Sequence, residues 1–458
     1  MCYYTFMTIV ISFACLCLLL ALGKFLRVKV GLFQRLFLPA SVIGGILGLI
    51  LLHTVKNYIP ASCTAGWSFL PGFLINIVFA TLFLGVTLPS VRYIWKEAGP
   101  QLVYGQIVAW GQYAVALFIS IAVLAPLFLV PKYFGVIVPV GFEGGHGTAA
   151  GLKPTFDLLK WTVGDDYCLA AATFGITTAI IIGIILINWA VRKKYVCGTK
   201  ELNESEKKGI YNIDERPIAG RQTTTPSSMD SLALHIAIVG IAIFVGFVLK
   251  VGLVLIGSLF LTPIQNEFFK AFPLFPLCMM GGIIVQIFIS KIIKIDIIDH
   301  GLMERISSTA LDFLVVAAIS IISLPLIMKG LIPLILVVVA GIGWNLFCIL
   351  VLAKRMLPDA WFERGIVEMG QSMGVTATGL LLLRIVDPEH KTPAYTAFGC
   401  KQLLHEPFMG GGLWTSIAIP LAIIHGSYLV LAISIVALIV WFVLWSVLFR
   451  KQLRGQNI

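Results

Sequence analysis

Apolar runs of about 20 residues constrain this chain more than any other feature, because a helix of that length crosses the hydrocarbon core of a bilayer. Such runs occupy residues 5–22, 67–88, 231–249 and 428–448. Lipid offers the backbone no hydrogen-bond partners, so a spanning segment satisfies its own N–H and C=O groups by forming a helix. A transmembrane β-barrel would instead show short segments of alternating polarity. The sequence therefore predicts an all-α polytopic membrane protein.

Composition and charge narrow the class of protein further. Hydrophobic residues make up 59% of the 458 residues and charged residues 12%, about half the share found in soluble domains. The net charge of +11 would suit a nucleic-acid partner, but the basic residues gather in short loops, as in membrane proteins. The nine cysteines show neither a CxxC motif nor the spacing of a metal site. We therefore expect a lipid bilayer around the chain, no nucleic-acid partner and no bound cofactor.

The apolar runs predict about eleven transmembrane helices. We place them near residues 5–23, 37–54, 67–88, 101–130, 166–191, 231–261, 272–293, 308–328, 331–353, 394–426 and 428–448. Most of the 33 Lys and Arg residues fall in alternate loops, at 24–35, 91–99, 192–230, 291–305, 354–364 and 384–391 and in the C-terminal tail. By the positive-inside rule these loops are cytoplasmic. This orientation places the N-terminus outside and the C-terminus in the cytoplasm.

One long polar segment, residues 192–230, divides the chain into halves of similar length. Its charged and Pro/Ser/Thr-containing composition is typical of a cytoplasmic linker. The first half is then residues 1–191 and the second half is residues 231–426. Residues 427–458 add an extra C-terminal helix and a cytoplasmic tail.

The two halves resemble one another. "HGTAAGL" at 146–152 corresponds to "MGVTATGL" at 373–380, and a glutamate precedes each, Glu143 or Glu368. Each segment follows four expected crossings and precedes the fifth of its half. Since five is an odd number, the two halves lie in the membrane with opposite orientation. The sequence therefore predicts two inverted five-helix repeats with paired re-entrant hairpins, near 135–165 and 364–390, a plan that recurs in secondary transporters.

The first glycine-rich stretch, "GFEGGHGTAAGLKPTF" at 141–156, combines flexible backbone with ionisable side chains. Irregular backbone is tolerated at membrane depth only where it is buried in protein or lines a watery cavity. Gly144, Gly145 and Gly147 suit a turn, and the Thr148 hydroxyl follows it. Glycines that only allow close helix packing, as we expect for Gly44–Gly45 and Gly281–Gly282, do not require a neighbouring glutamate and histidine.

Ionisable residues inside apolar segments are costly and are functional candidates by default. Glu143 is the first of these. His146 is either a ligand-binding residue or an interior histidine with an ordinary partner, and Glu368 is either functional or close to the cytoplasmic surface. The second stretch offers a set of small and hydroxyl groups like the first, namely Gly370, Gln371, Ser372, Gly374, Thr376 and Thr378.

A third polar segment, "GCKQLLHEPFMGGGLW" at 399–414, lies inside an expected crossing, where Pro407 and the following glycines should break the helix. Lys401 and His405 are four residues apart and so share a helix face. They could pair with Glu406, Glu143 or Glu368, either as an internally neutralised structural cluster or to recognise a carboxylate or couple a cation. Weaker candidates are Gln106, Gln112 and Asp312.

These motifs resemble those of the bacterial sodium/glutamate symporter family. The resemblance covers roughly residues 1–425 and rests on "FATLFLGV" (79–86), "GGHGTAAG" (144–151), "AATFG" (171–175) and "MGVTATG" (373–379). It implies a homodimer in the inner membrane, in which a transport domain moves like an elevator against a scaffold domain. It also implies sodium-driven uptake of glutamate. Glu143, Gln371, Ser372, Lys401, His405 and Glu406 depart from the pattern expected of that family.

We therefore expect a sodium-coupled symporter of glutamate or a related small anionic solute. A different solute or proton coupling on the same fold is the main alternative, and a channel or a membrane enzyme is a remote one. The chain contains no HExxH or Walker motif, so we do not expect an enzyme. The candidates for substrate binding are Glu143, Gly144, Gly145, His146, Gly147, Thr148, Gln371, Ser372, Gly374, Thr376, Thr378, Lys401 and His405. The candidates for cation binding or coupling are Glu143, Glu368, Glu406 and Gln112, with Na+, or alternatively H+, between the two hairpins.

Overall fold

The computed structural model describes residues 2–55, 58–86, 91–196, 208–225, 227–260, 268–388 and 391–449, and these residues contain helices but no strand. Eight helices in the described part are long and apolar enough to cross a membrane. The chain is therefore a multi-pass membrane protein, as predicted. Parts of the expected linker (197–207 and 226) and the basic tail from residue 450 lie outside the described residues.

The chain forms two compact units, and each half of the sequence contributes to both. Unit 1 comprises Met1–Leu88, Ala150–Thr162 and Glu204–Ile322, and unit 2 comprises Pro89–Ala149, Val163–Asn203 and Ser323–Ile458. Residues that are far apart in the sequence therefore share one core, which an assignment of domains to contiguous halves does not anticipate.

Unit 1 is a bundle in which glycines allow close helix contact. Its helices are α1 (Cys2–Lys29), α2 (Gly31–Arg35), α3 (Ala40–Thr54), α4 (Leu70–Thr81), α9 (Lys153–Leu158), α12 (Ser231–Phe260), α14 (Phe275–Phe288) and α15 (His300–Ser320). On α3, Gly44 lies against the backbone of α1 and Gly45 against Ile319 of α15. On α14, Gly281 lies against the backbone of α12 and Gly282 against that of α4. A side chain at any of these positions would collide with its neighbour, which confirms the packing role expected of these glycines.

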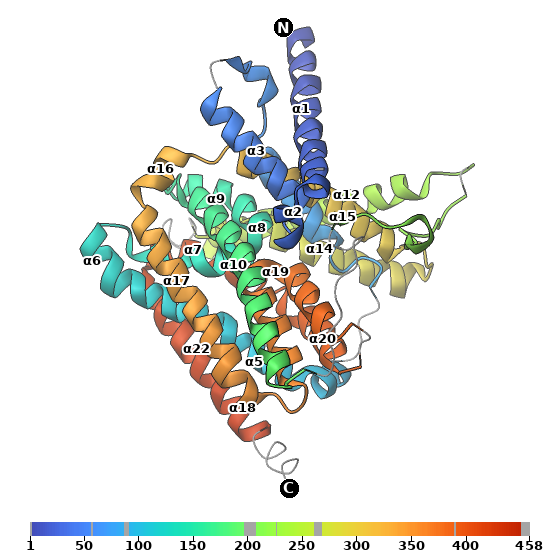
Figure 1. The fold of residues 1–458 in the computed structure, drawn as a ribbon. Coiled ribbons are helices and arrows are strands. Elements are labelled where there is room, and N and C mark those ends of the chain that lie inside the picture. Colours follow the sequence, from blue (N-terminus) through green and yellow to red (C-terminus); the bar gives the residue numbers. More distant parts are fainter. Residues whose placement is uncertain are drawn as a thin grey trace. The chain divides into compact units, whose positions relative to one another are not determined.

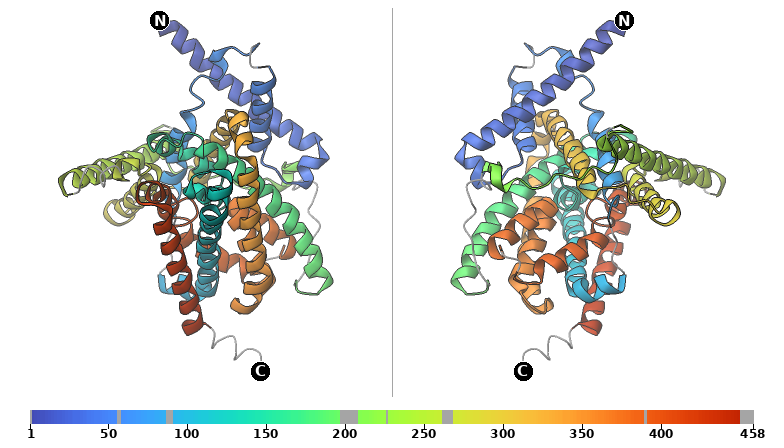
Figure 2. Two further views of the ribbon diagram at one scale, coloured as in Figure 1. Left: turned by 90° about the vertical axis from the view of Figure 1, so that its left-hand side faces the viewer. Right: turned by 90° about the vertical axis from the view of Figure 1, so that its right-hand side faces the viewer.

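Unit 2 is built around the 29-residue helix α5 (Val91–Ile119), which is buried throughout residues 101–114. Its helices are α5 (Val91–Ile119), α6 (Ala125–Phe128), α7 (Ile137–Phe142), α10 (Gly164–Arg192), α16 (Leu324–Lys329), α17 (Leu331–Phe347), α18 (Lys354–Met356), α19 (Trp361–Val386), α20 (Ala394–His405), α21 (Leu413–Pro420) and α22 (Ser427–Leu448). Helix α8 (Gly145–Gly151) begins in unit 2 and ends in unit 1. Within unit 2, α5 contacts α17, α20 and α22 (Figure 1), and Figure 2 shows α17 and α22 on either side of it.

Several expected boundaries were wrong. Residues 91–99 are not a loop, because α5 begins at Val91 and continues through Pro100. The expected crossing 394–426 is divided into two helices, α20 and α21, at residues 406–412, where Pro407 and the following glycines were expected to break it. The described residues contain eight helices long enough to span a membrane, and α3 and α4 are shorter apolar helices of 15 and 12 residues, so the number of eleven crossings stays a prediction.

Candidate functional site

Two helix breaks meet inside unit 2. The first lies between α7 and α8, where Gly145 has φ +66°, a conformation that glycine adopts without strain. The second lies within α19, where Gly374 and Val375 leave the helical conformation and Val375 has φ +63°. The side chain of Val375 lies directly against Gly145. A β-branched residue with positive φ is strained, and such strain is concentrated at functional sites.

The second break reverses the chain. A Cβ placed on Gly370 would lie 2.7 Å from the Cα of Gly379. In a straight helix these residues would be about 13.5 Å apart along the axis. Helix α19 is therefore two short arms packed side by side, and its turn faces the first break. The glycine pair is needed here because any larger side chain would force the arms apart.

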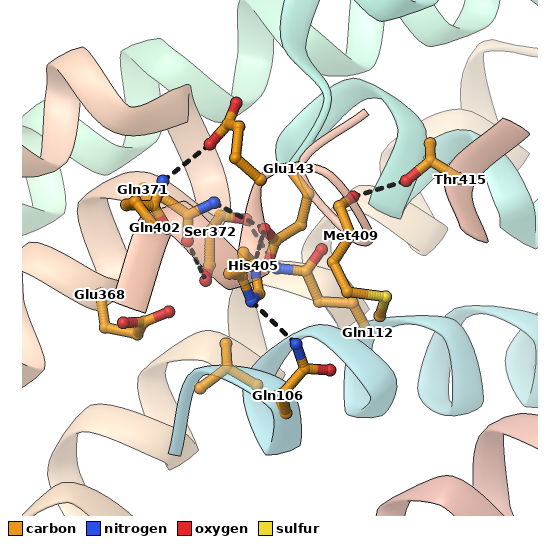
Figure 3. Close-up of polar contacts among 12 residues, drawn as sticks. Gln106, Gln112, Glu143, Glu368, Gln371, Ser372, Gln402, His405, Met409 and Thr415 are labelled. Carbon is orange, nitrogen blue, oxygen red and sulfur yellow. Dashed lines mark hydrogen bonds and ion pairs between the residues drawn. The ribbon is translucent and has the colours of Figure 1, made fainter. Parts of the chain in front are cut away.

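Glu143, at the first break, is held by a chain of hydrogen bonds that begins on α5 (Figure 3). Trp110 Nε1 donates to Gln106 Oε1 (3.1 Å), so the amide nitrogen of Gln106 faces His405 Nδ1 (3.3 Å). His405 Nε2 then carries the proton and donates to Glu143 Oε2 (3.1 Å). Gln371 Nε2 donates to the same oxygen (2.7 Å). Because indole is only a donor, Trp110 fixes the direction of the whole chain.

A second buried carboxylate, Glu368, is paired with Lys401. Lys401 Nζ lies 2.6 Å from Glu368 Oε1, and neither side chain is exposed. Gln101 Nε2 donates to the other oxygen, Oε2, at 2.7 Å. Lys401 Nζ also donates to Gln402 Oε1 (2.9 Å) and Gln371 Oε1 (3.3 Å). All three ammonium donors and both carboxylate oxygens therefore have partners.

The third carboxylate, Glu406, closes the cluster beside the second break. Gln402 Nε2 donates to Glu406 Oε2 (2.7 Å) and to Thr376 Oγ1 (2.6 Å), and the Thr376 hydroxyl donates to the same carboxylate oxygen (3.1 Å). On the other side, Gln112 Nε2 donates to the carbonyl of Ser372 (2.6 Å). The polar cluster, as we call this network, thus joins α5, α19 and α20 with both breaks.

Some buried polar atoms of the cluster and its wall have no hydrogen-bond partner among the described residues. They are Glu143 Oε1, Gln112 Oε1, Trp414 Nε1 and Ser416 Oγ. The Trp414 ring packs on Trp110, with ring centroids 4.6 Å apart. Trp414 therefore lies next to the first residue of the hydrogen-bond chain that ends at Glu143. A buried polar atom without a partner costs about 1–3 kcal/mol. Because unpartnered acceptors and donors lie in the same region, the region favours a ligand that carries both hydrogen-bond donors and hydrogen-bond acceptors.

The cluster also has an excess of negative charge. It holds two buried carboxylates, Glu143 and Glu368, and the half-buried Glu406, but one permanent cation, Lys401. Even a protonated His405 would leave one carboxylate uncompensated. Uncompensated charge is costly at membrane depth, so the arrangement favours the binding of a cation or a proton.

Most predicted residues come together here, but some do not. His146 lies on α8, and its Nε2 is 2.9 Å from Thr173 Oγ1 on α10. The Thr173 hydroxyl donates its proton to a backbone carbonyl, so His146 Nε2 is the donor in this hydrogen bond. Gly147 is inside α8 and not in the turn, which is formed at residues 143–145, and Thr148 follows the turn as expected. Asp312 belongs to unit 1, whereas the polar cluster belongs to unit 2.

The sequence analysis missed Gln101, Gln402 and Trp414. The glutamines were detectable in principle, because an amide in an apolar helix needs a partner. The sequence also allows Lys401 to pair with Glu368 and His405 to pair with Glu143, and both pairings are present.

Comparison with known proteins agrees with the family resemblance of the sequence motifs. The profile of the family described as Sodium/glutamate symporter matches residues 5–386. This range contains both breaks and ends before α20. A sodium/glutamate symporter from Haemophilus influenzae is 23% identical over 405 residues, which cover 85% of this chain and 92% of that protein. The low identity is that of a divergent relative.

Proposed function

Because the chain belongs to the sodium/glutamate symporter family, we propose that it couples the movement of sodium ions to the transport of glutamate or a related small anionic solute. The family consists of transporters and not of enzymes. The observation that carries the proposal beyond family membership is the polar cluster, in which an excess of carboxylates adjoins buried polar atoms without partners among the described residues.

The cation part of the cycle falls to the uncompensated carboxylates. Sodium prefers oxygen ligands, and Glu143 and Glu406 offer carboxylate oxygens beside the two helix breaks. A bound cation lowers the cost of the buried negative charge, and an anionic solute can then enter. A carrier that has bound only the cation or only the anionic solute would hold an unpaired charge in an apolar barrier, and this charge opposes the movement of the carrier. Strict coupling follows from this difference.

The solute part falls to the unpartnered atoms and the breaks. Glu143 Oε1 and Gln112 Oε1 are acceptors suited to the ammonium group of an amino acid. Trp414 Nε1 and the Ser416 hydroxyl are donors suited to a carboxylate. Helix starts at the two breaks add backbone N–H groups with a positive dipole end. We assign the substrate site to this region, including Gly144, Gly145, Gly374, Thr376 and Thr378 from the predicted set.

We further propose that the fold consists of two inverted repeats and that unit 2 is the moving carrier. Within unit 1, α3 contacts α1 and α15, and α14 contacts α12 and α4 in the same chain order. The packing glycines follow this pattern, Gly44–Gly45 on α3 and Gly281–Gly282 on α14. Each half also gives unit 2 a long helix, a broken segment and a further helix. This correspondence supports alternating access by movement of unit 2 against unit 1. Homodimer assembly, the inner-membrane location and the outside N-terminus stay predictions.

Proton coupling is the second candidate, and the Glu143–His405 pair favours it. Two titratable groups 3.1 Å apart at the ligand site can exchange a proton when a solute arrives. Replacing the sodium gradient by a proton gradient separates the two candidates.

Uptake by reconstituted protein tests the proposal. Liposomes containing the purified protein should accumulate radiolabelled L-glutamate when an inward sodium gradient is imposed. Accumulation should be lost when choline replaces sodium and in protein-free liposomes. Equal uptake with and without sodium, under a proton gradient, would favour the second candidate. Absence of glutamate uptake from a folded preparation under both gradients would refute glutamate as the solute.

A further inference from the structure

We propose that Lys401 is a built-in cation, whose ammonium group permanently fills one of the cation sites of the transporter. The site is the oxygen cage formed by Glu368, Gln371 and Gln402. The meaning of this inference for coupling rests on the proposed function, but the cation site itself does not. It explains why a buried lysine stands in the ligand region of a cation-coupled carrier.

The cage has the chemistry of a site for a monovalent cation. Its members approach Lys401 Nζ through oxygen atoms only: Glu368 Oε1 at 2.6 Å, Gln402 Oε1 at 2.9 Å and Gln371 Oε1 at 3.3 Å. One of them is a carboxylate, and all are supplied by α19 and α20. Hard cations in proteins select oxygen ligands of this kind. An ammonium group with three donors satisfies the same set.

The neighbouring backbone leaves room for this pair. Gly105 on α5 lies so close that a Cβ there would be 2.5 Å from Glu368 Oε1 and 2.6 Å from Lys401 Cε. The ring of Phe398, with its centroid 5.5 Å from Nζ, faces the ammonium group on its own helix. The pair is therefore enclosed by α5, α19 and α20 and is shielded from water.

The same contacts argue against the role that the sequence suggested for Lys401, recognition of a substrate carboxylate. Its three donors are used, and a substrate carboxylate could become the counter-charge of Lys401 only by displacing Glu368. Displacement would leave a fully buried carboxylate without its cation, which costs several kcal/mol. By contrast, an intact pair is neutral, so it can move with the carrier whether or not other ligands are bound.

Removal of the lysine charge should expose the cation site. We would purify wild-type protein, Lys401→Met and the double variant Lys401→Met/Glu368→Gln in choline buffer. Thermal unfolding would be followed while Na+, K+ or Li+ is added without any substrate. Lys132→Met, which removes an exposed lysine of unit 2, is the matched control. Direct titration of 22Na+ would give the number of ions bound per chain.

The inference predicts that Lys401→Met binds one monovalent cation more per chain than wild type and Lys132→Met. Its unfolding midpoint should rise with cation concentration more steeply than theirs. The double variant should lose the additional ion, because the carboxylate of the cage is gone. Should Lys401→Met not fold in choline, Na+ or K+ in the medium should restore a monodisperse preparation.

The inference is overturned if Lys401→Met binds no additional ion, or if no cation restores its folding. It is also overturned if the double variant still binds the additional ion. These outcomes do not depend on glutamate uptake by the wild type, so a wrong substrate or a wrong coupling ion in the proposed function gives a different pattern of results.

Discussion

Two glutamates in the polar cluster are equally buried but differ in how they are satisfied. Glu368 has a partner on each oxygen, Lys401 on Oε1 and Gln101 on Oε2. Glu143 has two partners on Oε2 and none on Oε1 among the described residues. The partner of Glu368 is a permanent cation, whereas His405, the partner of Glu143, is charged only when protonated.

This difference separates two uses of a buried carboxylate. A fully paired charge stabilises one arrangement of helices and offers nothing to a ligand. A half-paired charge remains expensive until something binds, and the binding free energy includes relief of that cost. We infer that Glu368 holds α5, α19 and α20 together, and that Glu143 faces the ligand. The predictions below test this contrast, beginning with the largest expected effect.

Breaking the Glu368 pair should be the most damaging change. Glu368→Gln leaves Lys401 buried without its counter-charge, which should lower the free energy of unfolding by about 3–5 kcal/mol. Adding Lys401→Met should recover most of this loss, because neither charge then remains. The stability of Glu368→Gln and of the double variant is measured by thermal unfolding in detergent, with chemical denaturation as a check. A double variant no more stable than Glu368→Gln would mean that the pair is not the source of the stability.

The same change at Glu143 should affect ligand binding and not stability. Loss of a charged acceptor should weaken glutamate binding by about 1.5–3 kcal/mol, or roughly 10- to 100-fold. The unfolding midpoint should change little, because the amide oxygen can accept the two hydrogen bonds of Oε2 and the amide nitrogen then replaces Oε1, which has no partner to lose. Calorimetric titration with glutamate in sodium buffer is the measurement. Glu304→Gln, a change of an exposed carboxylate in unit 1, is the control. Equal affinities of Glu143→Gln and wild type would remove Glu143 from the site.

Crowding the paired carboxylate should sharpen the contrast. Gly105→Ala places a methyl group against Glu368 and Lys401, and the forced shift should cost about 1–3 kcal/mol of stability. Gly399→Ala on α20 meets no atom within 4 Å, so it should be neutral or slightly stabilising, as expected for alanine in a helix. Both are compared by thermal unfolding. If the two alanines behave alike, close packing around the ion pair is not important.

A smaller effect should extend the contrast to hydrogen-bond donors. Trp110 Nε1 has a partner, Gln106, whereas Trp414 Nε1 has none among the described residues. Trp414→Phe should weaken glutamate binding by about 0.5–1.5 kcal/mol, or 2- to 10-fold, with little loss of stability. Trp110→Phe should instead leave Gln106 Oε1 without its donor and lower the free energy of unfolding. Titration and unfolding of the two variants side by side distinguish them, and the opposite pattern would exclude Trp414 as a ligand donor.

Much of this fold follows from the sequence, because membrane helices are specified by length and polarity alone. The site was anticipated where charge or glycine interrupts an apolar run, as at Glu143, Gly374 and Lys401, since such residues have few tolerated roles in lipid. The helix break after His405 was anticipated from Pro407 for the same reason.

What the sequence did not reveal depends on contacts between distant segments. The division into two units draws on three separate stretches of chain for each unit, and no local pattern encodes that. Gln101 and Gln402 have no charge, so their role is visible only when Glu368 and Lys401 lie beside them. His146 has the same residue type as His405, yet its partner is Thr173, because α8 faces α10 there. Partner choice is a property of packing.

Sodium-driven uptake by two neutralised variants tests the central claim most directly. Glu143→Gln and the double variant Lys401→Met/Glu368→Gln each replace buried charge by neutral groups in the same cluster. Reconstituted in liposomes at equal density, the double variant should keep sodium-dependent glutamate uptake, because a neutral pair has replaced a neutral pair. Glu143→Gln should lose it. Uptake that survives in Glu143→Gln and disappears in the double variant would contradict the account and would make Glu368, not Glu143, the carboxylate that meets the ligands.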